Sequence, residues 1–280
     1  MLKMSEYSKY VKYKTKYLKL KKRYIFSTNM ETAINSLMNS DETSVFIDTY
    51  LDKKDQKSID SLFSKEDITN NEFSYCGIFD ATSLGHKIDV FFEQITDDKN
   101  SMHLTRIINR IIDVYTKATK NDYIWINIRL QYPTPDYDIP RWHADGYYYN
   151  PEEYSKKKIP QIKLAGVLKG PPTLFKSGDQ NIFSKWSQLR RKLYKDFDYK
   201  NYDKKRDMEN RKIIDDELKE YQMVIAKKNE VAIFKAGHNG AIHSEPSINT
   251  KRVFYSILTG NREEILDWAT SQKKIFNDKK

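Results

Sequence analysis

The sequence contains very few of the residues that cross-link, break or loosen a chain. Cys76 is its only cysteine, which excludes an intramolecular disulfide and is typical of a reducing compartment. Nine Gly and eight Pro among 280 residues are too few for a largely disordered chain. No apolar run reaches the roughly 18 residues of a membrane-spanning helix, and the basic N-terminus lacks the apolar segment of a secretory signal. We therefore expect a soluble intracellular protein without a membrane span.

Positive charge is concentrated at the N-terminus. Residues 1–24 contain nine Lys or Arg and a single acidic residue, Glu6, so they carry +8 of the net charge of +10. Tyrosines alternate with these cations at the three-, four- and seven-residue spacing of a helix. We predict a basic arm over residues 1–28. Two interpretations are open: a helix that binds nucleic acid, an acidic protein surface or anionic lipid, and a solvated tail without a partner.

The composition of this arm, rich in tyrosine and lysine, resembles the N-termini of many proteins of the large nucleocytoplasmic DNA viruses. That resemblance implies a viral source and a location in the host cytoplasm or the virion. It concerns the arm alone, and we expect the remaining residues, 29–280, to form a single domain.

Hydrophobic periodicity predicts helices first and strands later in this domain. Apolar residues recur at helical spacing in 102–118, and a shorter helix is predicted over 87–95. Strands are predicted over 44–51, 73–79, 123–132, 162–168, 173–175, 230–236, 241–243 and 252–258, with a closing helix over 262–275. This order predicts an α+β fold, a β-sandwich or barrel with helices packed on one face.

Residues 180–222 interrupt the strands with charges of both signs. A helical stripe of Trp186, Leu189, Leu193 and Phe197 opens this segment. We predict a helical insertion between barrel strands. It is either a lid over a site or a solvated decoration.

A histidine and a carboxylate lie close together in Arg141–Gly146, which reads Arg-Trp-His-Ala-Asp-Gly and is expected to be a strand. Alternate side chains of a strand point to the same face, so His143 and Asp145 are predicted to lie together. A third ligand has to come from a distant strand, and His243 in residues 240–246 is the candidate. Two imidazoles and a carboxylate form the facial triad that binds iron(II) and leaves coordination positions open.

Two alternatives compete with this triad. His238 also lies near His243, but its surroundings in Ala236–Gly240 are typical of a tight turn or of a group beside a metal. In the other alternative, His143 and Asp145 are an ordinary surface pair, and His243 is satisfied by the backbone.

The order His-x-Asp, about a hundred residues, His243 and then Arg252 nine residues later resembles the 2-oxoglutarate- and iron(II)-dependent dioxygenases. The resemblance covers roughly residues 120–260 and implies a double-stranded β-helix core, of the jelly-roll or cupin-like kind. It implies Fe(II) and 2-oxoglutarate as cofactors, and hydroxylation of an unidentified substrate by dioxygen with release of succinate and CO2. It also implies that Arg252 binds the distal carboxylate of 2-oxoglutarate through a bidentate contact.

One position departs from the family pattern. Members often carry a Ser or Thr two residues after the arginine, but Phe254 occupies that place here. The hydroxyl partner of Arg252 therefore has to come from elsewhere, with Tyr132 preferred over Thr173. Alternative cations on neighbouring strands are Arg129, Arg141 and Lys163.

The aromatic residues Trp142 and Tyr147–Tyr149 are expected to line a substrate mouth, with ordinary core packing as the alternative. Two other functions stay open. One is a β-barrel binding or virion structural protein whose basic tail binds nucleic acid. The other is a zinc hydrolase in which Glu245 acts as the general base.

Overall fold

The order of elements places most helices before most strands. The computed structural model describes residues 2–65, 68–177, 180–198 and 200–277. The helices are α1 (Leu2–Asn39), α2 (Lys53–Asp60), α3 (Ala81–Glu93), α4 (Asp98–Thr119), α5 (Pro151–Lys157), α6 (Gln180–Leu193), α7 (Lys204–Glu217) and α8 (Arg262–Ser271). The strands are β1 (Ser44–Asp48), β2 (Glu72–Ile78), β3 (Tyr123–Gln131), β4 (Gln161–Lys169), β5 (Leu174–Lys176), β6 (Met223–Ile225), β7 (Glu230–Ala236), β8 (His243–Ser244), β9 (Arg252–Gly260) and β10 (Phe276–Asn277).

Two sheets form the strand-rich part, which makes the chain a mixed α/β protein with a large antiparallel sheet. The large sheet has the order β1-β7-β4-β9-β3-β2-β10 and is antiparallel except for the pair of β2 and β10. The small sheet has the order β6-β5-β8. A single bridge between His143 and His243 adds the segment Arg141–Gly146 beside β8.

The regular strand predicted over 141–145 is wrong, because this segment makes only that one bridge. Its other backbone groups bond elsewhere. The Arg141 N–H donates to the Ser244 hydroxyl at 2.8 Å, and the Asp145 carbonyl accepts from the Gly237 N–H at 2.8 Å. Side-chain and turn contacts, and not the regular hydrogen bonds of a strand pair, therefore hold this segment.

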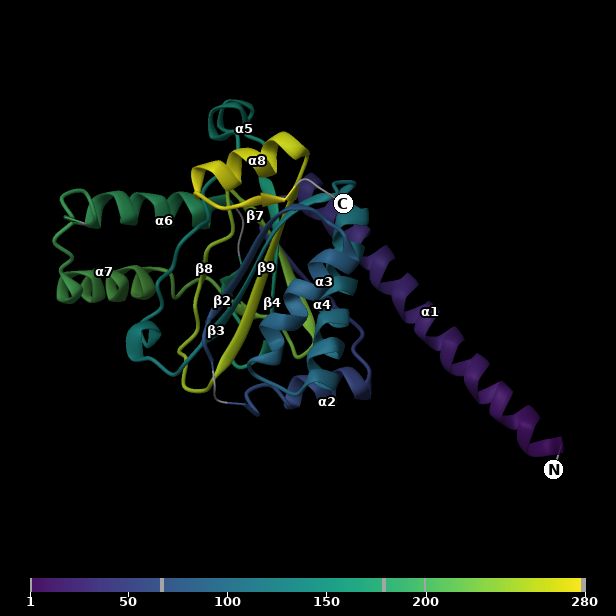
Figure 1. The fold of residues 1–280 in the computed structure, drawn as a ribbon. Helices are drawn as coiled ribbons and strands as arrows, with labels where there is room; N and C mark the ends of the chain where they lie inside the picture. The colour runs from purple at the N-terminus through teal and green to yellow at the C-terminus, as the bar shows by residue number, and fades with distance from the viewer. Residues whose placement is uncertain (1, 66–67, 178–179, 199, 278–280) are drawn as a thin grey trace.

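Alternation along the central strands separates an apolar face from a polar one. The apolar face packs against α1–α4 in the main core, and includes Ile124, Ile126, Ile128, Leu130, Val253, Tyr255 and Ile257. In Figure 1, α3 and α4 lie along this side of the large sheet. The intervening residues of the same strands, among them Arg129, Gln131, Arg252 and Phe254, line a cavity that also contacts the small sheet. The polar cavity therefore lies between the two sheets, with the helices behind the larger one.

Most strand predictions are confirmed, with ends shifted by one or two residues, and the clearest miss is a helix. Residues 53–60 were expected to be a polar loop but form α2. Asp52 caps this helix by accepting from the Lys54 and Asp55 N–H groups, and the Asp55 carboxylate bonds back to the Asp52 N–H at 2.9 Å. A reciprocal cap of this kind stabilises a short polar helix whose hydrophobic stripe is too weak to predict it.

The N-terminal helix α1 runs without a break through residue 28, the predicted end of the arm. Figure 1 shows its N-terminal part extending away from the rest of the molecule. Tyr13 and Tyr17 are exposed there, whereas Met30 and Leu37 are buried in the main core. The last turns of α1 thus anchor the helix to the domain. None of the helices, over the described residues, is long and apolar enough to cross a bilayer.

Candidate metal site

Three predicted ligands, His143, Asp145 and His243, converge at one end of the cavity between the sheets. Their ligand atoms all lie within 4.8 Å of one another. The two histidines face each other across the bridge: each backbone N–H donates to the other carbonyl at 2.8 Å, and their ring centroids are 4.3 Å apart. The Asp145 Oδ1 lies 3.8 Å from the His243 Nε2. Sheet pairing therefore brings together side chains about a hundred residues apart in sequence.

Hydrogen bonds to the backbone orient both imidazoles. The His143 Nδ1 lies 2.8 Å from the Arg141 carbonyl, and the His243 Nδ1 lies 3.0 Å from the Ala241 carbonyl. An Nδ1–H that donates to a carbonyl leaves Nε2 with its lone pair free for a metal. Burial, with His143 nearby, lowers the pKa of His243 to about 4, so this imidazole is neutral at neutral pH, as a metal ligand must be.

A lysine and a tyrosine hold the carboxylate of Asp145. Its Oδ2 accepts from the Tyr148 hydroxyl at 2.5 Å and from the Lys163 ammonium at 3.0 Å, and these two donors are themselves 2.6 Å apart. Burial raises the pKa of Asp145, but the Lys163 charge, helped by His243, outweighs it and holds this pKa well below its usual range. The carboxylate is therefore ionised, with Oδ1 on the side of His243.

Sequence reasoning missed this role of Lys163 and Tyr148. Lys163 was considered only as an alternative cation for 2-oxoglutarate, and Tyr148 only as part of a substrate mouth. One signal was present: Lys163 is the single charged residue between Ile162 and Leu168, in a strand that is otherwise apolar. A lone charge in such a strand needs a buried partner.

Replacing Tyr148 by Phe tests the support of Asp145. The variant keeps the ring and removes the hydroxyl, so Asp145 loses one of its two donors. Outer hydrogen-bond partners of ligands are typically worth about 10–100-fold in metal affinity, and we expect a loss in that range. Anaerobic titration with Co(II), followed by visible absorption, measures it. Tyr147→Phe is the matched control, since over the described residues the Tyr147 hydroxyl bonds the Tyr154 carbonyl and no metal ligand. Equal affinities in the two variants would contradict the role.

The cavity beside the triad has a volume of about 80 Å³ and a mixed lining of charged, polar and aromatic side chains. The residues that line it are Arg129, Gln131, His143, Asp145, Lys163, Ala165, Thr173, Phe234, His243, Glu245, Arg252 and Phe254. Two arginines thus share one small space with the metal ligands. This arrangement favours an anion near the metal.

Arg252 is buried, 2% exposed, and its guanidinium is held on three sides. Its Nε donates to the Pro171 carbonyl at 2.8 Å, its Nη2 to the Thr173 hydroxyl at 2.9 Å, and its Nη1 to the Gln131 side-chain oxygen. Two of its five N–H groups are left over. Burial lowers the pKa of Arg252 to about 10, so it stays charged at neutral pH. Within the described chain no carboxylate lies within ion-pair distance of it, although Glu245 in the same cavity favours its charged form. A buried cation without a direct partner favours binding of an anion.

Thr173, and not the preferred Tyr132, supplies the hydroxyl beside Arg252. The structure does not bring Tyr132 to the cavity: it lies just beyond β3, it is 38% exposed, and its ring contacts Phe63 with centroids 6.3 Å apart. Strand alternation explains the difference, because Gln131 faces the cavity and its neighbour faces away. Ser256, on the same face of β9 as Arg252, is fully buried with its hydroxyl oxygen unpaired.

Two polar atoms of residues that line the cavity are buried without a hydrogen-bond partner among the described residues. They are the Nε of Arg129 and the Oε2 of Glu245. The guanidinium of Arg129 lies 5.2 Å from the Phe254 ring centroid, and the other carboxylate oxygen of Glu245 accepts from Arg141 at 2.8 Å. Unpaired buried polar atoms are uncommon in native proteins, so their clustering here marks the place of a polar ligand.

None of the four aromatic residues predicted to line a substrate mouth is among the residues that line the cavity; Tyr148 instead bonds Asp145. Trp142 belongs to a separate cluster with Ile242 and Trp186, and Tyr149 is buried with its hydroxyl bonded to the Thr259 carbonyl at 3.1 Å. The ring of Tyr147 contacts that of Tyr154, with centroids 6.2 Å apart. His238 lies in the turn after β7 and is not among the converging ligand groups.

The helices of the insertion, α6 and α7, pack behind the ligand-bearing segments. Trp142 and Ile242 each precede a ligand and pack with Trp186, in a cluster completed by Ile182, Ile214 and Leu218. The Trp186 Nε1–H donates to the Trp142 carbonyl at 2.9 Å, and the Trp142 Nε1–H to Asp215 at 2.7 Å. These contacts join the start of α6 and the end of α7 to the segments that carry His143 and His243.

Replacing Trp186 by Phe tests how much the bond from Trp186 to the Trp142 carbonyl contributes to stability. The variant keeps an aromatic ring but leaves the Trp142 carbonyl without its donor, and an unpaired buried acceptor costs about 1–3 kcal/mol. We expect the free energy of unfolding to fall by that amount in urea titrations. Ser184→Ala, at an exposed position of the same helix, is the control. Unfolding midpoints that coincide for both variants would show that the bond contributes nothing.

A second cluster with the composition of a metal site, Asp52, Asp55 and His103, lies at the start of α2. Its groups already have partners. Asp55 bonds His103 at 2.8 Å and contacts Arg110 at 3.4 Å, and Asp52 caps the helix. An arginine so close to the carboxylate favours a structural ion pair over a bound cation.

Comparisons with known proteins found distant structural likenesses only. No protein-family model and no curated protein matches the sequence. Among solved structures, the chain is similar to a rice dioxygenase for auxin oxidation at 7% identity, covering 85% of this chain and 79% of that one, with a TM-score of 0.44. It is similar to a prolyl-4-hydroxylase of Pseudomonas putida (9% identity, 83% and 92% covered, TM-score 0.38). It is also similar to a prolyl hydroxylase from Trichoplax adhaerens in complex with a hypoxia inducible factor peptide (7%, 89% and 95%, 0.40). At such identities and TM-scores, the function has to be argued from the site itself.

Proposed function

We propose that this protein is a 2-oxoglutarate- and Fe(II)-dependent dioxygenase that hydroxylates an unidentified substrate with release of succinate and CO2. One observation carries the proposal. Two imidazole nitrogens and a carboxylate oxygen converge within 4.8 Å, in a cavity that also holds the buried cation Arg252. A structural zinc site closes four ligands around the metal, whereas three ligands leave positions open for a co-substrate and dioxygen.

The strand order supports a double-stranded β-helix as the core. Eight consecutive segments divide equally between the sheets. The large sheet takes β3, β4, β7 and β9, and the small one takes Arg141–Gly146, β5, β6 and β8. Seven strands and this one bridged segment, in two sheets, follow the arrangement of a jelly roll, which has eight strands. β1, β2 and β10 then extend the large sheet at its two edges.

Each residue of the site has a part in binding. His143, His243 and Asp145 would hold Fe(II), which when bound supplies the activation of dioxygen. Arg252 offers its two remaining N–H groups to the distal carboxylate of 2-oxoglutarate. Lys163 keeps Asp145 ionised through their ion pair at 3.0 Å. The residues fit this pair of cofactors, because two imidazole nitrogens and a carboxylate oxygen are available for the metal, and the unpaired buried Nε of Arg129 adds a donor for an anion in the same cavity.

Anaerobic titration of the protein with Fe(II) and 2-oxoglutarate tests the proposal without knowledge of the substrate. We expect a weak visible charge-transfer band that needs both components. Succinate should then form slowly in air, in the absence of any added substrate. Neither the band nor succinate at saturating Fe(II) would contradict the proposed function.

A metal hydrolase is the second candidate, and Glu245 favours it. Its side chain lines the cavity of the triad, and its Oε2 is buried without a partner, as a general base for a metal-bound water would require. Its other oxygen is paired with Arg141, which lowers its basicity. Zn(II) binding without any effect of 2-oxoglutarate would favour the hydrolase.

The arm is inferred to bind an anionic partner, either nucleic acid or an acidic protein surface. Exposed Tyr13, Tyr17 and Tyr24 share α1 with the lysines, in the part of the helix that extends from the molecule in Figure 1. Binding through this arm should weaken steeply with salt and vanish on deletion of residues 1–24. A viral source, and a location in the host cytoplasm or virion, stay predictions from composition.

A further inference from the structure

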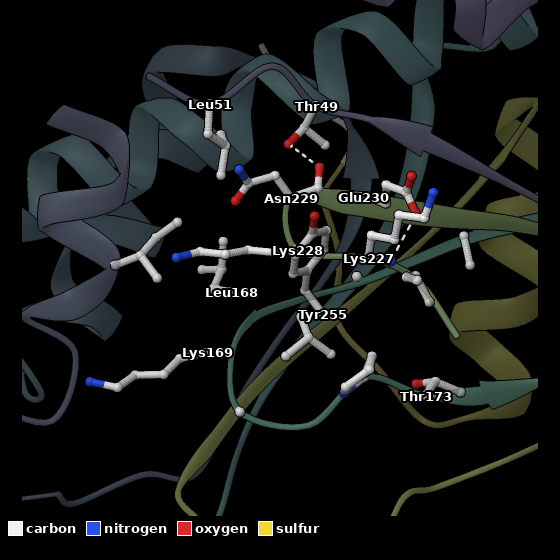
Figure 2. Close-up of a pocket in the computed structure, with 18 of the residues that line it drawn as sticks. Thr49, Leu51, Leu168, Lys169, Thr173, Lys227, Lys228, Asn229, Glu230 and Tyr255 are labelled. Atoms are coloured by element: carbon white, nitrogen blue, oxygen red, sulfur yellow. Dashed lines mark hydrogen bonds between the residues drawn. The ribbon is translucent and has the colours of Figure 1, made fainter. Parts of the chain in front are cut away.

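A second and larger cavity, of about 470 Å³, is lined by residues other than the three metal ligands (Figure 2). It is enclosed by the end of β4, the loop before β7, the residues after β1, and the helices α2 and α4. One wall is apolar and is formed by Leu51, Ile59, Ile107, Ile111 and Leu168. Cavities of this size and lining bind small molecules.

Tyr255 places a polar group deep in this cavity. The residue is 2% exposed, and its hydroxyl has no hydrogen-bond partner in the described part of the chain. A Cβ atom at Gly166 would lie only 2.4 Å from that hydroxyl oxygen, so glycine at this position gives the phenol its room. Because this hydroxyl faces the cavity, it is available to donate to an acceptor oxygen on a ligand.

Charged residues of both signs line the other side of the cavity: Lys169, Lys227 and Lys228 together with Asp60 and Glu230. Lys228 is an exposed residue whose long side chain extends into the space in Figure 2, and its ammonium has no ion pair or hydrogen bond among the described residues. The Lys169 ammonium is engaged, since it donates to the Asp60 and Leu62 carbonyls at 2.9 and 2.8 Å. Lys227 also lines the cavity. An unpaired ammonium beside an apolar wall favours an amphipathic anion.

We propose that this cavity binds a medium-chain carboxylic acid that carries a keto or hydroxyl oxygen on its chain. The carboxylate pairs with Lys228, the chain lies along the apolar wall, and the chain oxygen accepts from the Tyr255 hydroxyl. This site is independent of the proposed function. It shares only Ala165 and Thr173 with the cavity of the metal ligands.

Calorimetric titration of the full chain with decanoate, decanol and an oxodecanoate tests the site, in the presence of a chelator. We expect both carboxylates to bind, with oxodecanoate about three- to tenfold tighter because of one more hydrogen bond. Tyr255→Phe should abolish that preference and leave decanoate unaffected. Lys228→Met should weaken both acids about tenfold without affecting decanol. Lys156→Met, exposed on α5, is the control that should change nothing.

A second titration, with saturating 2-oxoglutarate, distinguishes binding in this cavity from binding in the cavity of the metal ligands. 2-Oxoglutarate would displace decanoate bound at Arg252, but it would not displace decanoate bound at Lys228. Displacement would overturn the proposal, as would the absence of decanoate binding or unchanged affinities in Lys228→Met. A failure here leaves the dioxygenase proposal standing, since the chelator removes the metal from the experiment.

Discussion

Replacing His143 by Ala is expected to abolish iron(II) binding, the largest effect of any single change in this protein. The loss of iron(II) affinity should exceed roughly 100-fold, the upper range for changes to the hydrogen-bond partners of a ligand. The reason is that the metal loses one of its three protein ligands. The band formed with 2-oxoglutarate and the succinate released in air should both disappear. Anaerobic titration and succinate detection measure these outcomes.

The fold should survive this change, which makes the result interpretable. The contribution of His143 to the small sheet is made by its backbone, through the two bonds to His243 at 2.8 Å. An alanine keeps both bonds. His238→Ala is the matched control, since His238 lies in the neighbouring turn outside the triad. If this control lost iron binding and His143→Ala retained it, the ligand set would be wrong.

Replacing Arg252 by Lys is expected to weaken 2-oxoglutarate binding strongly while leaving iron binding intact. Lysine keeps a charge but loses the planar fork that pairs with a carboxylate. Removing one partner of a buried, hydrogen-bonded charge pair costs about 2–5 kcal/mol, which corresponds to about 30- to 5,000-fold in Kd. Calorimetric titration of 2-oxoglutarate into the metal-loaded variant measures the loss.

Arg129 is the matched comparison, because it lines the same cavity and its Nε has no partner. We expect Arg129→Lys to have a smaller effect than Arg252→Lys. The reason is that Arg252 is held by Thr173, Gln131 and Pro171, which fix its guanidinium in advance of binding. If the Arg129 variant alone lost affinity, the carboxylate site would belong to Arg129.

The parts of the fold that follow from periodicity were predictable. The strands β3, β7 and β9 lie within one or two residues of their predicted ranges, because alternating or continuous apolar runs are local properties of the chain. The same alternation predicted that Arg252 and Phe254 share a face, and both line the cavity. The gathering of His143, Asp145 and His243 was predictable from residue type and spacing. The regular strand predicted for His143 and Asp145 was not found, because their segment makes a single bridge.

The partners of the site residues were much harder to predict. The preference for Tyr132 over Thr173 rested on sequence proximity to β3, whereas the hydroxyl beside Arg252 comes from the loop that precedes β5. The pairing of Lys163 and Tyr148 on Asp145 depends on how β4 lies against the segment after Gly146. Such contacts are set by packing between distant segments, and no local pattern encodes them.

The sequence alone determined the single cysteine, the order of helices and strands, the basic N-terminal helix and the spacing of three residues that can bind iron. Each of these features depends on composition or on local periodicity. Tertiary structure alone decided that Trp186 packs on the segment of His143, that Arg252 is buried without an ion pair among the described residues, and that the Tyr255 hydroxyl faces a second cavity. Those features depend on which faces meet when the two sheets and the helices pack together. Burial then shifts the pKa values of the polar groups, and it leaves some of them without a hydrogen-bond partner in the protein, so that a ligand can supply one.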